Sequence, residues 1–547
     1  MTATSLLTQQ MIESYTARGY WGSMTLGDYL DHHAAYTPDK EALVDVKTRV
    51  TYGRFKLVTD RIALKLLELG LRPGDRLGLQ TPNWVEYFYV RFACAKMGAI
   101  PVPFIYSVRE HEIEGTMADV EAAAFAFCTD FHDFDYLEMV ERLRPKLPRL
   151  EHLICIGPRT GAGMINLREI IEDEIEKRYP PGHLLKFHPG ANDIDILMST
   201  SGSTARPKIV LRTPNVFISL GHHIVQRAGM GPDEIVLAVA PVNQGTGYSV
   251  AVVASLIVGC KNVLLERFIP EEALRLIQRE KATMAVGVPA QMIKIMNSPS
   301  FDQYDLKTLR LFYHAGAPLP PDAAAGFARK CGCRLMEAYG ALDGGTPVHT
   351  LLDDPPERIY HTVGKACPGM ELKIFDDQNR ELPPGEVGEV VYKGPTCAVG
   401  LYNNPDHAYD PDGWFHSGDL GVLDEEGYLK IVGRKKDIII RGGQNISPKE
   451  IEDVLINHPL VKEISVVKMP DQVLGEKACA FVVPREGAAV RLEDLTEFLL
   501  ARNFAKYKLP ERVENVTEIP LLPNGKVNKK ALEAEIEHKL RMEGKLG

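Results

Sequence analysis

The chain has 547 residues, of which 45% are hydrophobic and 25% charged, and this is the composition of a folded globular protein rather than a disordered or fibrous one. Its 63 Lys and Arg residues stand against 73 Asp and Glu residues, a net charge of −10. This balance argues against a protein that mainly grips nucleic acid, because such proteins present a basic face to the phosphates. At roughly 150 residues per domain, the length predicts about three to four domain-sized units.

The sequence predicts neither a membrane span nor a secretory start. The longest strongly apolar run, residues 250–258, is about half as long as a membrane-spanning helix requires, and the first residues lack a basic cluster. Nine cysteines show no C-x-x-C pairing, which is typical of buried free thiols in a reducing compartment. We therefore expect a cytoplasmic protein.

Residues 51–351 alternate short β-rich runs with helix-length stretches. Strands are expected at 234–239, Arg76–Gln80 and Ile100–Phe104, each followed by a helix. Such alternation predicts parallel sheets with helices on their faces. From residue 372 onward, the turn signals at 383–385 and 412–413 favour antiparallel hairpins and a small barrel-like region.

A further boundary is expected near Gly433, where a strand at 428–432 ends in a polar turn. A new strand follows at 438–440, and Ser447, Pro448 and Glu450 then predict a capping box at the start of a helix. Strands at 464–469 and 478–483 and a helix at 492–502 complete the pattern. The C-terminal part therefore reads as a compact α+β unit of about 110 residues.

The hydroxyl-rich segment 199–208 follows a strand predicted at 194–198 and ends at Lys208. Its hydroxyl groups, backbone N–H groups and one ammonium suit phosphate oxygens. The spacing is not that of a Walker A loop. A polar surface turn explains such a cluster equally well, so this segment alone leaves both interpretations open.

Two charged residues nearer the C-terminus permit a nucleotide site without requiring one. Asn524-Gly525 lies between extended runs and predicts a hairpin, which places Lys526 just past a tight turn. Most lysines in such a place are solvated, although a cation there suits the charge that develops on an α-phosphate under attack by a carboxylate. Asp419 could be an ordinary turn acid, but its two oxygens can accept hydrogen bonds from two ribose hydroxyls.

Taken in order, these segments resemble the acyl- and aryl-adenylating superfamily, which comprises acyl-CoA synthetases, stand-alone adenylation enzymes and luciferases. The resemblance covers about residues 19–532 and rests on segments 199–208, 315–319, 338–340, 414–419, 433–443 and 520–526. It implies an α/β fold with a large N-terminal domain at 1–433, built of parallel-sheet subdomains plus a small β-barrel-like region. A hinge at 434–436 and a small mobile α+β domain at 437–547 would follow.

The resemblance also implies roles for individual residues. Lys526 would be the catalytic residue, Lys436 the hinge, Asp343 the metal ligand, and Gly442 and Gly443 would line the CoA path. The nucleotide would be bound by Thr200, Ser201, Gly202, Ser203, Thr204, Lys208, Gly316, Ala317, Pro318, Glu337, Ala338, Tyr339, Gly340, Asp419 and Arg434. The acyl pocket would be lined by Gln244, Gly245, Tyr248, Ala338, Gly340 and Gly345.

Four residues depart from the family pattern. The family usually has a glycine where Ala205 stands, and it follows its Tyr-Gly with x-Thr-Glu, where this chain has Leu342 and Asp343. Leu342 has no side-chain donor, while Asp343 keeps an oxygen ligand for Mg²⁺ on a shorter stem. Gln244 stands where the family commonly has histidine, so it can position a carboxylate but cannot titrate.

The resemblance implies an AMP-forming acid:CoA ligase that uses ATP, Mg²⁺ and coenzyme A. It would form an acyl-adenylate and then the thioester, and could run in reverse to make ATP. The start at residues 18–21 looks most like members acting on aryl or other cyclic carboxylates, and the small pocket residues include no Lys or Arg. We therefore expect a cyclic, aromatic or alicyclic monocarboxylic acid.

Two alternatives to this prediction stay open. One is a stand-alone aryl-acid adenylating enzyme that loads a carrier-protein thiol. The other is a non-catalytic nucleotide-binding relative, which Leu342 and Asp343 motivate. The expected partners are small molecules and not nucleic acid, and the protein could be a monomer or a homodimer.

Overall fold

The computed structural model describes residues 4–199, 208–402, 404, 408–485, 489–522 and 526–546. The chain divides into two compact units. The first comprises Met1–Glu371 with Lys393–Tyr409, and the second comprises Leu372–Tyr392 with Asp410–Gly547. Residues 200–207 of the hydroxyl-rich segment and residues 523–525 of the predicted hairpin lie outside the described residues.

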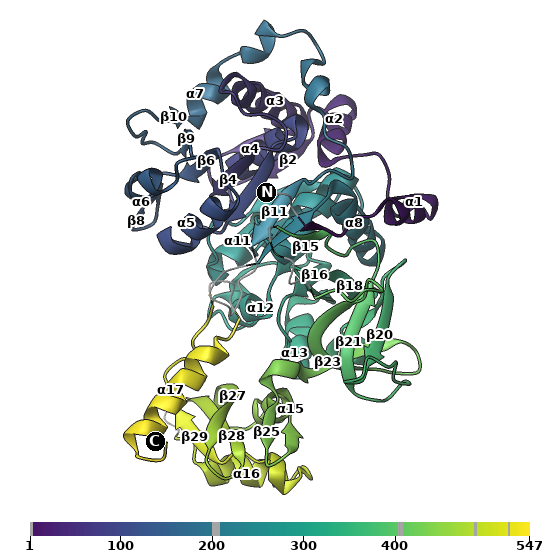
Figure 1. The fold of residues 1–547 in the computed structure, drawn as a ribbon, viewed down its shortest axis with the longest axis vertical. Coiled ribbons are helices and arrows are strands. Elements are labelled where there is room, and N and C mark those ends of the chain that lie inside the picture. Colours follow the sequence, from purple (N-terminus) through teal and green to yellow (C-terminus); the bar gives the residue numbers. More distant parts are fainter. Residues whose placement is uncertain are drawn as a thin grey trace. The chain divides into compact units, whose positions relative to one another are not determined.

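One parallel sheet of the first unit has the strand order β10-β9-β6-β4-β5. Its central strand β6 is buried at every residue, as expected when helices cover both faces. In Figure 1 the helices α3 (Tyr52–Glu68), α4 (Val85–Met97), α5 (Glu110–Asp119), α6 (Tyr136–Leu143) and α7 (Leu167–Glu172) surround this sheet. The strands are β4 (Arg76–Gln80), β5 (Ile100–Phe104), β6 (Ala124–Cys128), β9 (His152–Ile156) and β10 (Ile165–Asn166).

A second sheet of the same unit has the order β3-β2-β14-β13-β15-β16-β17-β18-β19. It is parallel from β2 to β17 and antiparallel beyond. Its strands are β2 (Glu41–Val44), β3 (Arg49–Thr51), β13 (Ile235–Ala238), β14 (Lys261–Leu264), β15 (Met284–Gly287), β16 (Leu311–Ala315), β17 (Arg334–Ala341), β18 (Gly345–His349) and β19 (Gly364–Ala366). The strands predicted at 76–80, 100–104 and 234–239 are thus present.

The two faces of this second sheet belong to different cores. Tyr313, Met336 and Ala338 pack into the main apolar core, whereas Phe312 and Leu335 pack into the other. This separation follows from the alternation of side chains along a strand. The helices that accompany the sheet are α8 (Pro214–Ala228), α10 (Ser255–Val258), α11 (Pro270–Glu280), α12 (Pro289–Met296), α13 (Pro321–Cys331) and α14 (Pro356–His361).

A small antiparallel sheet flanks the hydroxyl-rich segment. Its order is β1-β22-β12-β11, and Ser199 pairs with Ile209, so residues 200–208 connect two neighbouring strands. The strands are β1 (Thr4–Ser5), β11 (Ile196–Ser199), β12 (Ile209–Arg212) and β22 (Gly400–Leu401). The N-terminal helices α1 (Gln9–Ala17) and α2 (Leu26–Tyr36) complete the unit.

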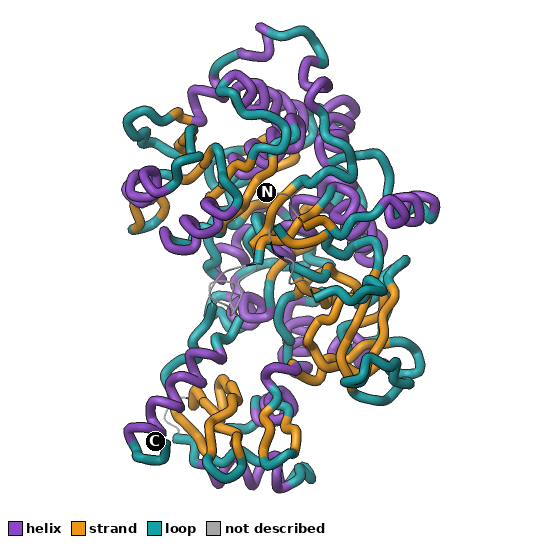
Figure 2. The backbone as a smooth tube through the Cα atoms, in the orientation of Figure 1, coloured by secondary structure: helices purple, strands orange, loops and turns teal. Residues whose placement is uncertain are grey.

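The second unit begins with the antiparallel hairpins that the turn signals predicted. The strands β20 (Glu371–Phe375), β21 (Gly388–Lys393), β23 (Phe415–Leu423) and β24 (Tyr428–Arg434) neighbour one another in this order. A small core of Phe375, Val391 and Trp414 holds them. Figure 2 shows these strands as orange stretches of the backbone tube.

The C-terminal part is a sheet with helices on both faces, as expected for an α+β unit. The order is β26-β25-β28-β27, and β29 pairs with β28. Alternating residues of β27 face two cores, Val466 toward one and Val467 toward the other. The elements are β25 (Ile439–Arg441), β26 (Gln444–Ile446), β27 (Val461–Asp471), β28 (Gly475–Pro484), β29 (Arg512–Asn515), α15 (Pro448–Leu455), α16 (Leu492–Leu500) and α17 (Lys529–Met542).

The predicted capping box of α15 is wrong, although the helix begins where it was expected. Ser447 occupies the N-cap position, but its side chain makes no capping hydrogen bond. Instead, the Ser447 hydroxyl donates to the Val432 carbonyl oxygen at 2.7 Å. The hydroxyl therefore ties the start of α15 to strand β24.

No helix within the described ranges is long and apolar enough to cross a membrane. The apolar run at 250–258 forms most of a buried π-helix, η4 (Tyr248–Ala254), and all of the short helix α10. All nine cysteines are free and buried. These observations agree with the expected globular interior.

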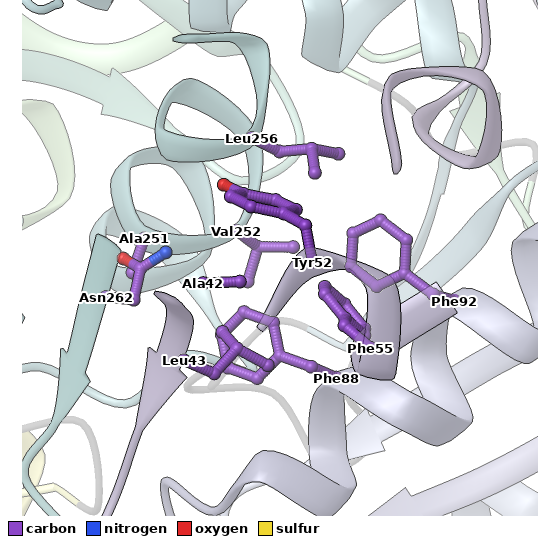
Figure 3. Close-up of a pocket in the computed structure, with 10 residues that line it drawn as sticks. All are labelled: Ala42, Leu43, Tyr52, Phe55, Phe88, Phe92, Ala251, Val252, Leu256 and Asn262. Carbon is purple, nitrogen blue, oxygen red and sulfur yellow. The ribbon is translucent and has the colours of Figure 1, made fainter. Parts of the chain in front are cut away.

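A small apolar cavity beside Val252 and Tyr52 lies within this interior. Figure 3 shows its mostly aromatic and aliphatic walls, with the amide of Asn262 at one side. Its volume is about 10 Å³. Since a single water needs about this much space, the cavity is a gap in the packing and not a site for an acid or nucleotide.

Candidate active site

The first charged cluster lies in the first unit, where the hydroxyl-rich segment ends. The Lys208 ammonium is 3.6 Å from the Asp343 carboxylate, and each side chain keeps roughly a quarter to a third of its surface exposed. Lys208 precedes β12, and Asp343 lies in the turn between β17 and β18. The fold thus brings together the predicted phosphate-binding lysine and the predicted metal ligand. The predicted ligands Thr200, Ser201, Gly202, Ser203 and Thr204 lie outside the described residues.

Buried contacts hold the Asp343 turn from below. Arg212 donates through Nη1 to the Thr396 carbonyl oxygen at 2.8 Å and through Nη2 to the Leu342 carbonyl oxygen. The Tyr409 hydroxyl is 3.3 Å from the Asp343 carbonyl oxygen. Because Arg212 ends β12, it links the strand that leaves the hydroxyl-rich segment to the turn that carries Asp343.

The departure at Leu342 has a structural reason. Its side chain packs against a small apolar cluster of Val210, Ala398 and Leu401. A threonine there would place a hydroxyl against carbon atoms. The leucine therefore serves packing beneath the turn, while Asp343 beside it presents a carboxylate.

The glycines predicted to line the acyl pocket lie where backbone segments approach closely. A β-carbon on Gly340 would be 2.2 Å from the Gly345 carbonyl oxygen, and one on Gly345 would be 2.4 Å from the Thr396 carbonyl oxygen. Gly345 also has φ +102°, a conformation that favours glycine. Their small size is therefore required by the fold of this turn, in addition to any room that it leaves for a ligand.

The predicted adenine-binding segments lie at the ends of adjacent parallel strands. Ala315 at the end of β16 pairs with Ala338 on β17, and Gly316 begins the next turn with φ +90°. Ala317 and Pro318 continue this turn. Glu337 and Tyr339 are partly buried on β17, on either side of the buried Ala338. The carboxyl ends of parallel strands thus meet where the resemblance places the nucleotide.

Gln244 and Gly245 lie in the connection before η4, and Tyr248 begins that helix. Gln244 is partly buried, and its backbone carbonyl oxygen accepts a hydrogen bond from the Tyr248 backbone N–H at 3.2 Å. Tyr248 is fully buried in the core that also contains Ala338. It can form a wall of a pocket, but it is not an open surface.

A buried ion pair fixes the Tyr248 hydroxyl. Arg91 donates to it through Nε at 3.0 Å and through Nη2 at 2.8 Å, and also pairs with the Asp195 carboxylate. Burial raises the pKa of Tyr248, so the phenol stays neutral. Asp195 immediately precedes β11, so Arg91 links η4 to the strand that enters the hydroxyl-rich segment.

The second charged cluster lies in the second unit, on the hairpin of β23 and β24. Asp419 and Arg434 are directly opposite each other in the antiparallel register, and Arg434 Nε is 2.5 Å from Asp419 Oδ1. Asp419 is only 8% exposed, and its backbone N–H donates to the Ser417 hydroxyl. Arg434 thus orients the carboxylate of Asp419, the residue predicted to bind the ribose.

Lys526 belongs to the same cluster. The hairpin that carries it is present, because Leu521 pairs with Val527 and the Leu522 N–H donates to the Lys526 carbonyl oxygen at 2.7 Å. Asn524 and Gly525 at its tip lie outside the described residues. Desolvation by the surrounding protein lowers the pKa of Lys526. The charges of Arg434 and Lys436 act in the same direction, and the charge of Asp419 acts against them.

The predicted CoA-path glycines form the turn between β25 and β26. Gly442 and Gly443 have φ +55° and +84°, and Arg441 pairs with Gln444, so the two glycines make a two-residue hairpin turn with both φ values positive. This geometry alone explains the glycines. Lys436 is exposed in a short 3₁₀ turn at Lys435–Asp437, directly after β24.

No sequence motif predicted three of the residues that hold these segments in place. Arg91, Asp195 and Arg212 lie in segments without a motif, and their partners are more than one hundred residues away. A buried arginine in an apolar helix is the one local signal, because arginine is almost never fully buried unless it is paired. That signal does not indicate which acidic residue the arginine pairs with.

Comparison with known proteins identifies the family. Residues 30–402 match the AMP-binding enzyme family, and residues 450–526 match the AMP-binding enzyme C-terminal domain. The chain is 32% identical to the medium-chain fatty-acid–CoA ligase of Escherichia coli K12, over 99% of this chain and 95% of that protein. It is 33% identical to the 2,3-dihydroxybenzoate-AMP ligase of Bacillus subtilis 168, over 97% of each chain.

The fold agrees with solved structures. The anthranilate CoA ligase AuaEII in complex with anthranoyl-AMP superposes with a TM-score of 0.85 and 25% identity, over 95% of this chain and 98% of that one. The α/β class with parallel sheets and a C-terminal α+β domain is thereby confirmed. The chain belongs to the AMP-binding enzyme family, and its relatives support an AMP-forming acid–thiol ligase.

Proposed function

We propose that the protein is a cytoplasmic, AMP-forming CoA ligase for a cyclic, aromatic or alicyclic monocarboxylic acid. The observation that carries this proposal is the cluster of Asp419, Arg434 and Lys526. It combines a buried carboxylate for ribose with two cations in one unit of the chain. Such a set suits a nucleotide whose α-phosphate is the reacting group.

In the first half-reaction, an oxygen of the substrate carboxylate attacks the α-phosphorus of ATP and pyrophosphate leaves, which forms the acyl-adenylate. Lys526 neutralises charge that develops on the phosphate and stabilises the transition state more than the ground state. Asp419 accepts hydrogen bonds from the ribose hydroxyls, and Lys208 binds the leaving phosphates. Gln244 orients the acid, which brings the two reacting groups together.

Mg²⁺ fits the Asp343 side chain. The carboxylate is partly exposed, and 3.6 Å from the Lys208 ammonium it stands where phosphate oxygens would gather. Magnesium commonly takes one or two carboxylates together with substrate phosphates and water. The ion would neutralise phosphate charge, and Asp343 and Lys208 would share the task of holding the phosphates.

In the second half-reaction, the thiol sulfur of CoA attacks the acyl carbon, AMP leaves and the thiol proton passes to solvent. We propose that residues 437–547 rotate about Lys436 in the segment 434–436 relative to residues 1–433. This step would withdraw Lys526 and bring Gly442 and Gly443 beside the thioester. Such domain steps can limit turnover.

The choice of a ring acid rests on the residues proposed for the pocket. Gln244, Gly245, Tyr248, Ala338, Gly340 and Gly345 include no cation that would bind a second carboxylate, and several of them are small. The similarity to the anthranilate CoA ligase and to the 2,3-dihydroxybenzoate-AMP ligase supports a ring. The similarity to the medium-chain fatty-acid–CoA ligase makes a linear acid the competing substrate.

A panel of acids in the pyrophosphate–ATP exchange assay tests this function. Benzoate, cyclohexanecarboxylate and cyclohexenecarboxylate should each stimulate exchange, and octanoate should do so far less. Exchange with no acid of the panel would contradict the proposal. Formation of ATP from the acyl-CoA, AMP and pyrophosphate should follow with the same acid, because each step is reversible.

Loading of a carrier protein is the second candidate function, favoured by the similarity to the 2,3-dihydroxybenzoate-AMP ligase. Thioester formation with free CoA separates the two. Rapid release of AMP that depends on CoA supports the CoA ligase. Acyl-adenylate that accumulates in the presence of CoA supports a carrier-dependent enzyme, and any acyl-adenylate excludes a non-catalytic relative.

A further inference from the structure

Three buried side chains beneath the proposed pocket form a hydrogen-bonded chain that the proposed mechanism does not use. The Tyr313 hydroxyl is 2.8 Å from His349 Nε2, and His349 Nδ1 is 2.8 Å from Cys367 Sγ. Tyr313, His349 and Cys367 are each at most 2% exposed. They come from β16, from β18 and from the segment after β19.

The register places this chain under Ala338. His349 on β18 is directly opposite Ala338 on β17, and Tyr313 on β16 is directly opposite Met336 on β17. Directly paired residues share a face, and so do residues two apart on one strand. The hydrogen bond between Tyr313 and His349 therefore crosses β17 on the face that carries Met336 and Ala338.

This face belongs to the core that contains Tyr248. Tyr313, Met336, Ala338 and Tyr248 are all members of that core. Of the two residues that β17 contributes here, Ala338 is the smaller and is the one assigned to the acyl pocket. The aromatic pair thus occupies the space immediately beyond the assigned pocket wall.

The chain is neutral and tightly oriented. Burial holds the pKa of His349 well below its usual range, and nearby His223 and Arg227 act in the same direction. Burial likewise raises the pKa of the Cys367 thiol to about 12. A neutral imidazole has one N–H and one acceptor nitrogen, so one partner on each side satisfies both atoms. Moving either ring would leave buried polar groups without partners, which is unfavourable.

We propose that the hydrogen-bonded pair of Tyr313 and His349 is the floor of the acyl pocket and restricts it to compact acids. This inference rests on the proposed function and names the residues that set its substrate class. A ring carboxylate ends above Ala338. A linear acid of eight or more carbons would have to displace the Tyr313 ring and the His349 ring, and Cys367 holds the latter from the other side.

Removal of the imidazole tests the floor. The assay compares kcat/KM for benzoate and for decanoate in acid-dependent AMP release. The unsubstituted protein should prefer benzoate, and His349→Ala should shift the ratio toward decanoate by about tenfold or more, since each methylene accommodated is worth roughly tenfold or more. His314→Ala is the matched control, because His314 is equally buried on β16 but faces the opposite side. It should leave the ratio unchanged.

Tyr313→Phe provides a second variant that keeps the core volume and removes only the hydroxyl. It should retain its thermal midpoint within a few degrees and shift the ratio in the same direction by a few-fold, because the imidazole is no longer held. An unchanged ratio in Tyr313→Phe and in any folded His349 variant would overturn the floor. Equal use of decanoate and benzoate by the unsubstituted protein would overturn it as well.

The two proposals fail separately. If no acid gives a CoA thioester, the proposed function is wrong whatever the variants do. If ring acids are activated but substitutions at Tyr313 and His349 leave the ratio of kcat/KM for benzoate and decanoate unchanged, only the proposed floor is wrong.

Discussion

The charged pair of the first unit and the charged pair of the second are held in different ways. Asp419 and Arg434 lie opposite each other on an antiparallel ladder, 2.5 Å apart, and the Asp419 side chain is largely buried. Lys208 follows a connection and Asp343 lies in a turn, 3.6 Å apart, and the Asp343 side chain is more exposed than that of Asp419. One pair is built into a sheet, and the other joins two irregular segments.

This difference matches what each pair would bind. A ribose keeps its shape throughout the reaction, so a preorganised carboxylate is an advantage there. Phosphates and a metal ion must enter, and pyrophosphate must leave, so the loose pair can separate without breaking a strand. We therefore expect substitutions in the second unit to affect the chemical step and substitutions at the Lys208–Asp343 pair to affect binding.

The largest effect is expected for Lys526→Ala. Pyrophosphate exchange should fall by about a hundredfold to a thousandfold, because one preorganised charge on the transition state is lost. The exposed Lys506 of the same unit is the matched control, and Lys506→Ala should leave exchange unchanged. Normal exchange in Lys526→Ala would refute the assigned role.

A smaller effect is expected for Asp343→Ala. The Mg²⁺ concentration that gives half-maximal exchange should rise by about tenfold or more, because a carboxylate of the metal set is lost. Asp343→Glu should recover most of the loss. Asp302→Ala, an exposed acid elsewhere in this unit, should behave like the unsubstituted protein. A lowered kcat of Asp343→Ala at saturating Mg²⁺ and ATP would contradict the expectation that the Lys208–Asp343 pair affects binding and not the chemical step.

Leu342→Thr introduces the residue that the family usually has. Because Leu342 packs on Val210, Ala398 and Leu401, the change should destabilise the first unit by about 1 kcal/mol and should not raise activity. Denaturant unfolding of Leu342→Thr and of the unsubstituted protein measures the difference in the free energy of unfolding. A faster adenylation rate in Leu342→Thr would show that the hydroxyl position matters more than the packing.

The smallest effect is expected for Lys436→Gln, measured by the pH profile of exchange. The Lys436 charge lowers the pKa of Lys526, so its removal should raise that pKa. Lys526 acts as a cation, so activity falls as pH rises through its pKa. The alkaline limb should therefore move to higher pH, by a fraction of a unit, and a shift to lower pH would contradict the cluster.

The sequence predicted elements well where the pattern is local. The strands at Arg76–Gln80 and Ile100–Phe104 have the bounds that their β-rich runs indicated. The capping box at Ser447 failed because its hydroxyl is directed to a carbonyl oxygen of β24 and accepts no N–H group of α15. The split at 434–436 remains a prediction, and the contacts of the chain place 410–433 in the same unit as the C-terminal part.

The sequence by itself determined the family, the order of the motifs and the types of residue that could bind a nucleotide, because these depend on local spacing. The tertiary structure alone decided which charges meet and which side chains lie beneath the proposed pocket. Asp419 meets Arg434 through strand register, and Tyr313 meets His349 across an intervening strand. Such pairings depend on how distant segments pack, and local patterns carry no record of them.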